Sequence, residues 1–205
     1  VMMQCFFLMG LMTVIWALYG YSLAFGGSNP YIGNFDHVFM EGVERVWDPA
    51  KENPADEDGN VRLGAPHTPM ADNGKIPAIT FMLFQGMFFI ITPALICGAY
   101  AERMKFSTMV VFTILWGTLV YCPLAHWVWN SEGWLSVKVG ARDFAGGLTI
   151  HTASGVAALV VSLMLQKRRV QRAKPHNLPL TILGGALIWA GWYSFNGGSA
   201  YAANT

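Results

Sequence analysis

Charged residues are scarce in this 205-residue chain, at 12% of the sequence, against about 25% in a typical soluble domain. Hydrophobic residues make up 54%, and the 13 basic and 12 acidic residues gather in short islands between long charge-free stretches. This distribution excludes an ordinary soluble domain and is typical of a protein that spans a lipid bilayer. The net charge of +1 and the lack of a basic stripe give no indication of a nucleic-acid partner.

Cysteine is also rare. Cys5, Cys97 and Cys122 lie inside apolar stretches and have no CxxC spacing, so the sequence predicts neither a disulfide framework nor a zinc site. We expect the three thiols to be small packing groups. No metal or other cofactor is predicted.

Five segments free of Asp, Glu, Lys and Arg are long enough to cross a hydrocarbon core, which needs about 20 apolar residues as helix. Backbone polar groups in lipid must be satisfied internally, and membrane barrels show short alternating segments, so we expect helices. The predicted fold is an all-α, polytopic helical bundle forming one transmembrane domain, 1–205. Its spans are expected at about 1–25, 76–101, 106–128, 144–166 and 178–199.

The basic residues predict the orientation. Connections 102–105 and 167–174 hold seven Lys and Arg against a single acid, so the positive-inside rule places them in the cytoplasm. The acidic connection 26–75 and the connection 130–142 would then both lie outside. Connection 26–75 is rich in Pro, Gly, Asn and Asp, so we expect it to be irregular, with one short helix near 39–46.

His151 lies seven residues into the fourth segment, about 10 Å below its outer end at about 1.5 Å per residue. Ionisable residues at such depth usually face the bundle interior or a water-filled path. The alternative is a buried neutral histidine, bonded to a neighbouring carbonyl or hydroxyl. Asp143 precedes the same segment and has the position of an N-cap. Its two possible roles are therefore to stabilise the start of the helix or to contact the substrate directly.

Aromatic residues cluster at two outer helix ends. His126, Trp127 and Trp129 end the third segment, where aromatics ordinarily form an interfacial belt. The fifth segment ends in the polar and aromatic string 192–199, which exceeds what an ordinary C-cap requires. Phe88 alone would be interpreted as a core or lipid-facing residue.

Five strings occur in order along the chain: YGYSLAF at 19–25, GAYAER at 98–103, DFAGG at 143–147, PHNLP at 175–179 and GWYSFNGGS at 191–199. Together they resemble the ammonium transporter family (Amt/Mep/Rh), on its bacterial Amt side. The resemblance covers nearly the whole chain except the outer connection after Asn34. It implies transport of ammonium or ammonia across the cytoplasmic (inner) membrane.

The resemblance also implies site residues. Trp129, Phe88 and Ser199 would form the outer ammonium recruitment site, where the Ser199 hydroxyl accepts a hydrogen bond from the ion. Phe88 and Phe195 would be two stacked phenyl rings that close the pore mouth. His151 would line the pore as the first of the family's twin histidines.

Asp143 would support the recruitment site without touching the ion. The implied mechanism is recruitment, deprotonation and passage of neutral ammonia through a hydrophobic, His-lined pore, and whether the proton also crosses stays open. The alternative function is an ammonium sensor that signals to a cytoplasmic partner. An enzyme is not predicted, because HExxH, GxSxG and paired intramembrane carboxylates are absent from the sequence.

The family has about eleven membrane helices, and this chain would begin within the second and stop after the sixth. We therefore expect a fragment of the N-terminal half, with the natural N-terminus upstream of Val1 and the second pore histidine outside the chain. The family resemblance further implies a homotrimer in the lipid bilayer and a PII-type signalling protein at the cytoplasmic face. The role of connection 26–75 stays open.

Overall fold

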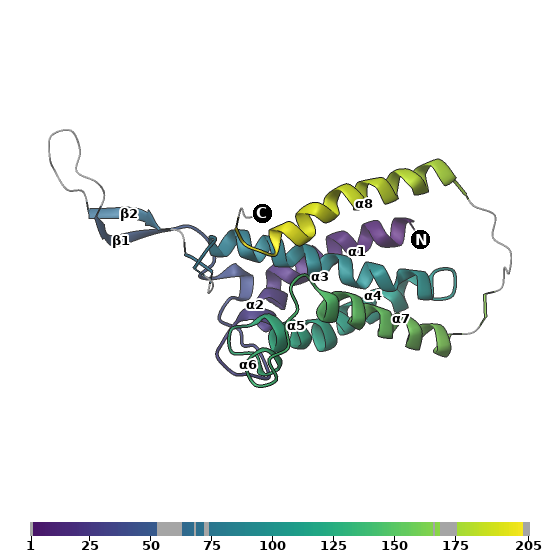
Figure 1. Ribbon diagram of the computed structural model, residues 1–205, viewed down its shortest axis with the longest axis horizontal. Coiled ribbons are helices and arrows are strands. Elements are labelled where there is room, and N and C mark those ends of the chain that lie inside the picture. The colour runs from purple at the N-terminus through teal and green to yellow at the C-terminus, as the bar shows by residue number, and fades with distance from the viewer. Residues whose placement is uncertain are drawn as a thin grey trace.

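A computed structural model describes residues 2–52, 63–67, 69–71, 74–165, 167–168 and 176–202. It contains five helical segments long and apolar enough to cross a membrane, at 2–25, 78–100, 106–137, 147–164 and 178–198. They form an elongated bundle whose helices run roughly along its long axis (Figure 1). The predicted multi-pass helical bundle with about five spans is confirmed.

Three of the five spans contain a π-helical turn, labelled η. In chain order the elements of the spans are α1 (Met2–Ile15), η1 (Trp16–Gly20), α2 (Tyr21–Phe25), α3 (Ala78–Tyr100), α4 (Phe106–Trp116), η3 (Gly117–Tyr121), α5 (Cys122–Trp129), η4 (Gly147–Thr152), α7 (Ala153–Met164) and α8 (Leu178–Gly198). The short helix α6 (Trp134–Val137) follows α5 in the next connection. Because π-turns are frequent at functional sites, the one that contains His151 is of particular interest.

The core lies where the first, second and third spans meet. The Trp16 ring is 5.0 Å from Phe89, and Phe89 is 5.2 Å from Tyr121. Gly86 permits this packing, because a Cβ there would lie 2.9 Å from the Trp16 indole. The indole N–H of Trp16 also donates a 3.0 Å hydrogen bond to the Met82 carbonyl. These contacts fix the half of α3 that begins at Ala78 and carries Phe88.

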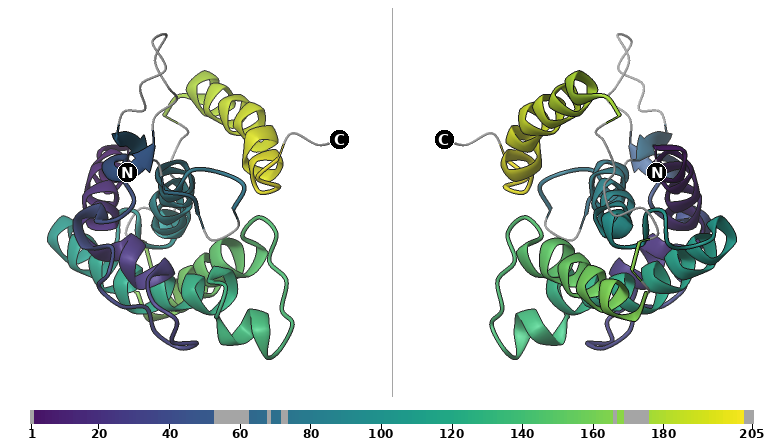
Figure 2. Two further views of the ribbon diagram at one scale, coloured as in Figure 1. Left: turned by 90° about the vertical axis from the view of Figure 1, so that its left-hand side faces the viewer. Right: turned by 90° about the vertical axis from the view of Figure 1, so that its right-hand side faces the viewer.

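Helix α8 is packed differently from the others. None of its residues is buried, and it stands apart from the other helices over much of its length (Figure 2). Its N-cap is Asn177, whose side chain accepts a 3.0 Å hydrogen bond from the backbone N–H of Leu180. Its other end returns to the bundle, where a Cβ on Gly198 would lie 2.7 Å from the Phe84 ring. The contact with α3 is therefore made near the candidate site.

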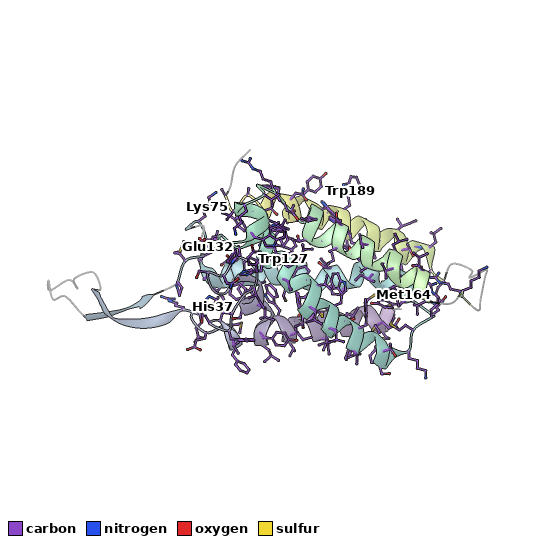
Figure 3. All side chains as sticks on the ribbon, turned by 90° about the horizontal axis from the view of Figure 1, so that it is seen from below. His37, Lys75, Trp127, Glu132, Met164 and Trp189 are labelled. Carbon is purple, nitrogen blue, oxygen red and sulfur yellow. The ribbon has the colours of Figure 1, made fainter. Side chains whose placement is uncertain are left out.

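The connections alternate between the two ends of the bundle. His37, Lys75 and Glu132 lie at one end, and Met164 lies at the opposite end (Figure 3). Connections 26–75 and 130–142 thus share an end, as alternation requires. Which end faces the cytoplasm stays a prediction, and residues 169–174 of the basic connection lie outside the described part of the chain.

Connection 26–75 is more ordered than we expected. Strands β1 (Val46–Glu52) and β2 (Leu63–His67) pair antiparallel, with Val46 opposite His67, and project from the end of the bundle (Figure 1). The short helix expected near 39–46 is instead a 3₁₀ turn, η2 (Val38–Met40). Pro49 obscured the strand, yet a two-stranded ribbon tolerates proline because both of its strands are edges.

Candidate functional site

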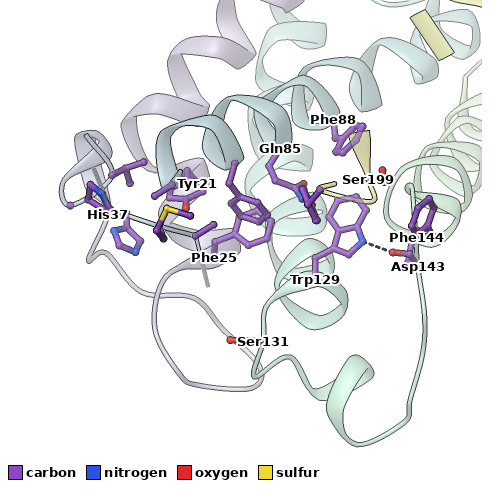
Figure 4. A pocket seen from close by; sticks show the side chains of 18 residues that line it. Tyr21, Phe25, His37, Gln85, Phe88, Trp129, Ser131, Asp143, Phe144 and Ser199 are labelled. Carbon is purple, nitrogen blue, oxygen red and sulfur yellow. Dashed lines mark hydrogen bonds between the residues drawn. The ribbon is translucent and has the colours of Figure 1, made fainter. Parts of the chain in front are cut away.

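A cavity of about 440 Å³ opens at the end of the bundle that carries the long connection. Its walls come from α2, α3, α5, the connections and the segment after α8. Trp129, Phe88 and Ser199 all line it, together with Asp143 (Figure 4). The structure therefore brings the three residues of the predicted recruitment site to one cavity, although they are up to 111 positions apart in the sequence.

The Trp129 side chain contacts both Asp143 and Phe88. Its indole N–H donates a 2.8 Å hydrogen bond to the backbone carbonyl of Asp143, and its ring lies 5.8 Å from Phe88 at 42°. Ser199 is 8% exposed, and its hydroxyl donates a 3.0 Å hydrogen bond to the Phe195 carbonyl. Since that bond uses the hydroxyl hydrogen, the lone pairs of Ser199 Oγ are left to accept from a ligand.

The Asp143 carboxylate organises the start of the fourth span. Its Oδ1 accepts from the backbone N–H groups of Gly146 and Gly147 at 2.6 and 2.8 Å. Its Oδ2 accepts from the N–H of Leu148 at 2.8 Å, and from the N–H and hydroxyl of Thr149 at 2.9 and 3.0 Å. A carboxylate at this position satisfies helix donors that would otherwise lack partners. Asp143 thus caps η4 while its carbonyl holds Trp129.

Gly146 makes that cap possible. Its backbone has φ +95°, in the left-handed region, and a Cβ there would lie 2.2 Å from Cδ1 of Ile150. Both the conformation and the space require glycine. The cap, the glycine and the π-turn Gly147–Thr152 together determine where His151 lies.

Phe88 and Phe195 touch with their ring centroids 4.7 Å apart and an interplanar angle of 66°. The rings meet edge to face, so the prediction of stacked phenyl rings was wrong in its geometry. Edge-to-face contact is one of the arrangements that the aromatic quadrupole favours. Phe88 lines the first cavity and Phe195 a second one, so the two rings join the walls of both cavities.

The second cavity, of about 560 Å³, contains the His151 side chain. The imidazole stacks on Trp192 at 5.6 Å and 20°, and lies 6.3 Å from the Phe195 ring. His151 is exposed within the described part of the chain. Whether the imidazole lines a pore in the complete protein stays a prediction.

The other two members of the aromatic cluster bond to the end of α2 and to the start of connection 26–75. His126 is fully buried, with its ring nitrogens 3.1 Å from the Ala24 carbonyl oxygen and 2.6 Å from that of Asn29. The Trp127 indole donates a 2.6 Å hydrogen bond to the Tyr31 carbonyl. Only Trp129 of the three lines the cavity. The cluster therefore divides into two structural residues and one cavity residue.

The first cavity is also lined by Gln85 and Tyr201, which no sequence pattern singled out. The Gln85 Nε2 donates a 2.9 Å hydrogen bond to the Tyr201 hydroxyl. Gln85 is 2% exposed, and its Oε1 accepts no hydrogen bond from the described residues. Burial raises the pKa of the Tyr201 phenol, which keeps that hydroxyl neutral. A lone amide in an apolar span is a signal that could have identified Gln85.

The fold and the site together define a class: a multi-pass α-helical membrane protein with an aromatic cavity at one end and an imidazole beside the aromatic contact. Comparison with known proteins identifies the family. The model of the Ammonium Transporter Family matches residues 1–205, and the chain belongs to this family. The resemblance seen in the five sequence strings is confirmed.

Individual relatives agree with this assignment. An ammonium transporter of Mycobacterium bovis is 46% identical over 208 residues, covering 96% of this chain and 42% of that protein. The crystal structure of Candida albicans Mep2 matches with a TM-score of 0.76 at 36% identity, covering 97% of this chain and 40% of that one. A structure described as a sensor Amt protein shares the fold, with a TM-score of 0.77 at 24% identity. The chain thus spans less than half the length of these relatives.

Proposed function

We propose that this chain forms part of a path for ammonium or ammonia across the cytoplasmic membrane, with recruitment of the ion at the outer cavity. The observation that carries the proposal is the convergence of Trp129, Phe88 and Ser199 on one cavity wall. The names of the family and of its relatives support ammonium as the substrate.

The recruitment step uses aromatic faces and one hydroxyl. A cation over an aromatic ring gains about 0.5–2 kcal/mol, and the Trp129 and Phe88 rings, whose centroids are 5.8 Å apart, both line the cavity. The Ser199 oxygen adds an acceptor for an N–H of the ion, which potassium does not have. This combination favours a small hydrogen-bonding cation.

Asp143 contributes charge without direct contact. Its carboxylate lines the cavity, yet its two oxygens already accept hydrogen bonds from the start of η4. The negative charge stabilises a nearby cation through space, since such interactions strengthen where water is excluded. Its second role is to orient Trp129 through the backbone carbonyl.

The contact between Phe88 and Phe195 is proposed as the gate. Moving an intact ion past two apolar rings requires loss of its hydration, whose free-energy penalty far exceeds the cation–π attraction. Loss of a proton to water at the open end of the cavity removes most of that penalty. Neutral ammonia then reaches His151, whose imidazole offers one donor and one acceptor nitrogen without ionising.

The proposal also includes the orientation of the chain in the membrane and its assembly. Connections 26–75 and 130–142 face outward, and 102–105 and 167–174 face the cytoplasm. The complete protein is proposed to form a homotrimer, with a PII-type signalling protein at its cytoplasmic face. The exposed apolar faces of α7 and α8 are available to lipid or to protein in that assembly.

The test is reconstitution of the complete protein into liposomes, with equal inward gradients of ammonium and potassium measured separately. Ammonium or ammonia should enter faster than in protein-free liposomes, while potassium should not. Ammonium entry at the protein-free rate would contradict transport. Saturable ammonium binding without entry would instead support the sensor function, because the fold shared with the sensor Amt protein is compatible with either activity.

A further inference from the structure

Two cysteines that are 92 positions apart in the sequence meet in the bundle. The Sγ of Cys5 in α1 and the Sγ of Cys97 in α3 are 3.7 Å apart. Both cysteines are free and half-buried. Their spacing in the sequence gave no indication of this pairing, because helix packing alone creates it.

The third cysteine has a different environment. Cys122 is fully buried, and its Sγ points to the backbone carbonyl of Gly20 at 3.6 Å. A thiol in that position has packing and a weak hydrogen bond. The chain therefore contains one juxtaposed pair and one isolated thiol, which serves as an internal control.

The pair lies close to the polar end of α3. Cys97 is three residues before the end of that helix at Tyr100, which corresponds to about 5 Å along the axis. The Arg168 guanidinium donates a 2.7 Å hydrogen bond to the carbonyl of the adjacent Gly98. A guanidinium bonded to the backbone next to Cys97 indicates that this end of α3 lies near the membrane surface, within reach of small polar oxidants from the aqueous phase.

We propose that Cys5 and Cys97 form an oxidisable dithiol that closes to a disulfide linking α1 to α3. A disulfide holds its sulfurs about 2 Å apart, so the pair must close a gap of less than about 2 Å. The oxidant is a hydroperoxide, the chemical class that reacts with thiolates.

The reaction balances in two steps. One thiolate attacks the terminal peroxide oxygen, the O–O bond breaks, and a sulfenic acid and one molecule of water or alcohol result after protonation. The second thiolate attacks the sulfenic sulfur, the S–S bond forms, and hydroxide leaves and is protonated to water. The two sulfurs together lose two electrons, which the peroxide accepts.

The link would join two helices that lie beside each other in the bundle. Helix α3 carries Phe88 in its outer half and Cys97 near its other end, with Pro93 between them. Proline removes a backbone hydrogen bond and permits bending. A disulfide at Cys97 would therefore hold the part of α3 beyond Pro93 against α1.

The test uses the complete protein in native membranes, treated with hydrogen peroxide, alkylated, and digested without reductant for mass spectrometry. A peptide pair linked through Cys5 and Cys97 should appear and should vanish after reduction. It should be absent from Cys5→Ser and Cys97→Ser, and retained by the control Cys122→Ser. Recovery of both cysteines alkylated and unlinked, or as sulfinic acids without a linked form, would overturn the proposal. Because the readout is a covalent bond, it is independent of whether the protein transports ammonium.

Discussion

The indole N–H of Trp129 is hydrogen bonded at 2.8 Å to the backbone carbonyl of Asp143, a residue whose side chain caps the next membrane helix. One residue thus connects the aromatic wall of the first cavity to the start of the helix that carries His151. Anything that disturbs the cap should move both the recruitment site and the imidazole. This coupling links the stability of the helix start to the proposed function.

Replacing Asp143 by Asn tests the cap. The amide keeps one acceptor oxygen, but its NH₂ group cannot accept from Leu148 or Thr149. Leaving such donors without a partner costs about 1–3 kcal/mol, so the complete protein should melt at a lower temperature. The control is Glu132→Gln, an exposed residue in connection 130–142. Equal melting temperatures for the two variants would contradict the structural role of Asp143.

Gly146→Ala should also destabilise the complete protein. The left-handed conformation costs a non-glycine residue about 1–2 kcal/mol, and the new Cβ would lie 2.2 Å from Ile150. Gly147→Ala is the matched control, because a Cβ there meets nothing within 4 Å. Thermal denaturation in detergent should separate the two variants. A larger loss for Gly147→Ala would be inconsistent with the geometry of this turn.

The role of His151 can be tested by measuring which of ammonia and potassium its variants transport. A carboxylate in place of the imidazole would hold an ion where a neutral molecule is otherwise handled, so His151→Asp should admit potassium and slow ammonia. His151→Ala should change the rate without admitting potassium to the same extent. His176→Asp, at an exposed position before α8, is the control. Wild-type rates and selectivity in both His151 variants would remove this residue from the mechanism.

The proposed orientation predicts the access of labelling reagents. On intact cells, a membrane-impermeant maleimide should modify Glu132→Cys in the complete protein, whereas Lys105→Cys should react only after permeabilisation. The complete protein without an added cysteine provides the background. The reverse pattern would invert the topology.

Features that depend on neighbouring residues were predictable from the sequence, whereas features that depend on contacts between distant residues were not. The five spans were predictable because each depends on a local property, an apolar run about 20 residues long. The strand containing Pro49 was missed, since proline and acidic residues ordinarily indicate an irregular loop. Strand pairing between Val46 and His67 is non-local, and composition does not reveal it.

In the candidate site, too, local sequence strings were informative and contacts between distant residues were not. Trp129, Phe88 and Ser199 were selected because their surrounding strings resemble a known family, and the structure then placed them around one cavity. The bond between Gln85 and Tyr201 joins residues 116 positions apart, so only the packed bundle reveals it. The edge-to-face geometry of the aromatic contact likewise depends on how α8 meets α3, which no local pattern encodes.

The most direct test of the central claim is the concentration dependence of ammonium uptake by the complete protein carrying Trp129→Leu. Trp127→Leu is the matched control, because Trp127 is also half-buried near the same helix end but does not line the cavity. Loss of a cation–π contact worth about 0.5–2 kcal/mol should raise the half-saturating concentration about two- to thirtyfold in Trp129→Leu, and leave that of Trp127→Leu unchanged. An unchanged value for Trp129→Leu, at normal amounts of inserted protein, would show that Trp129 has no part in recruiting ammonium.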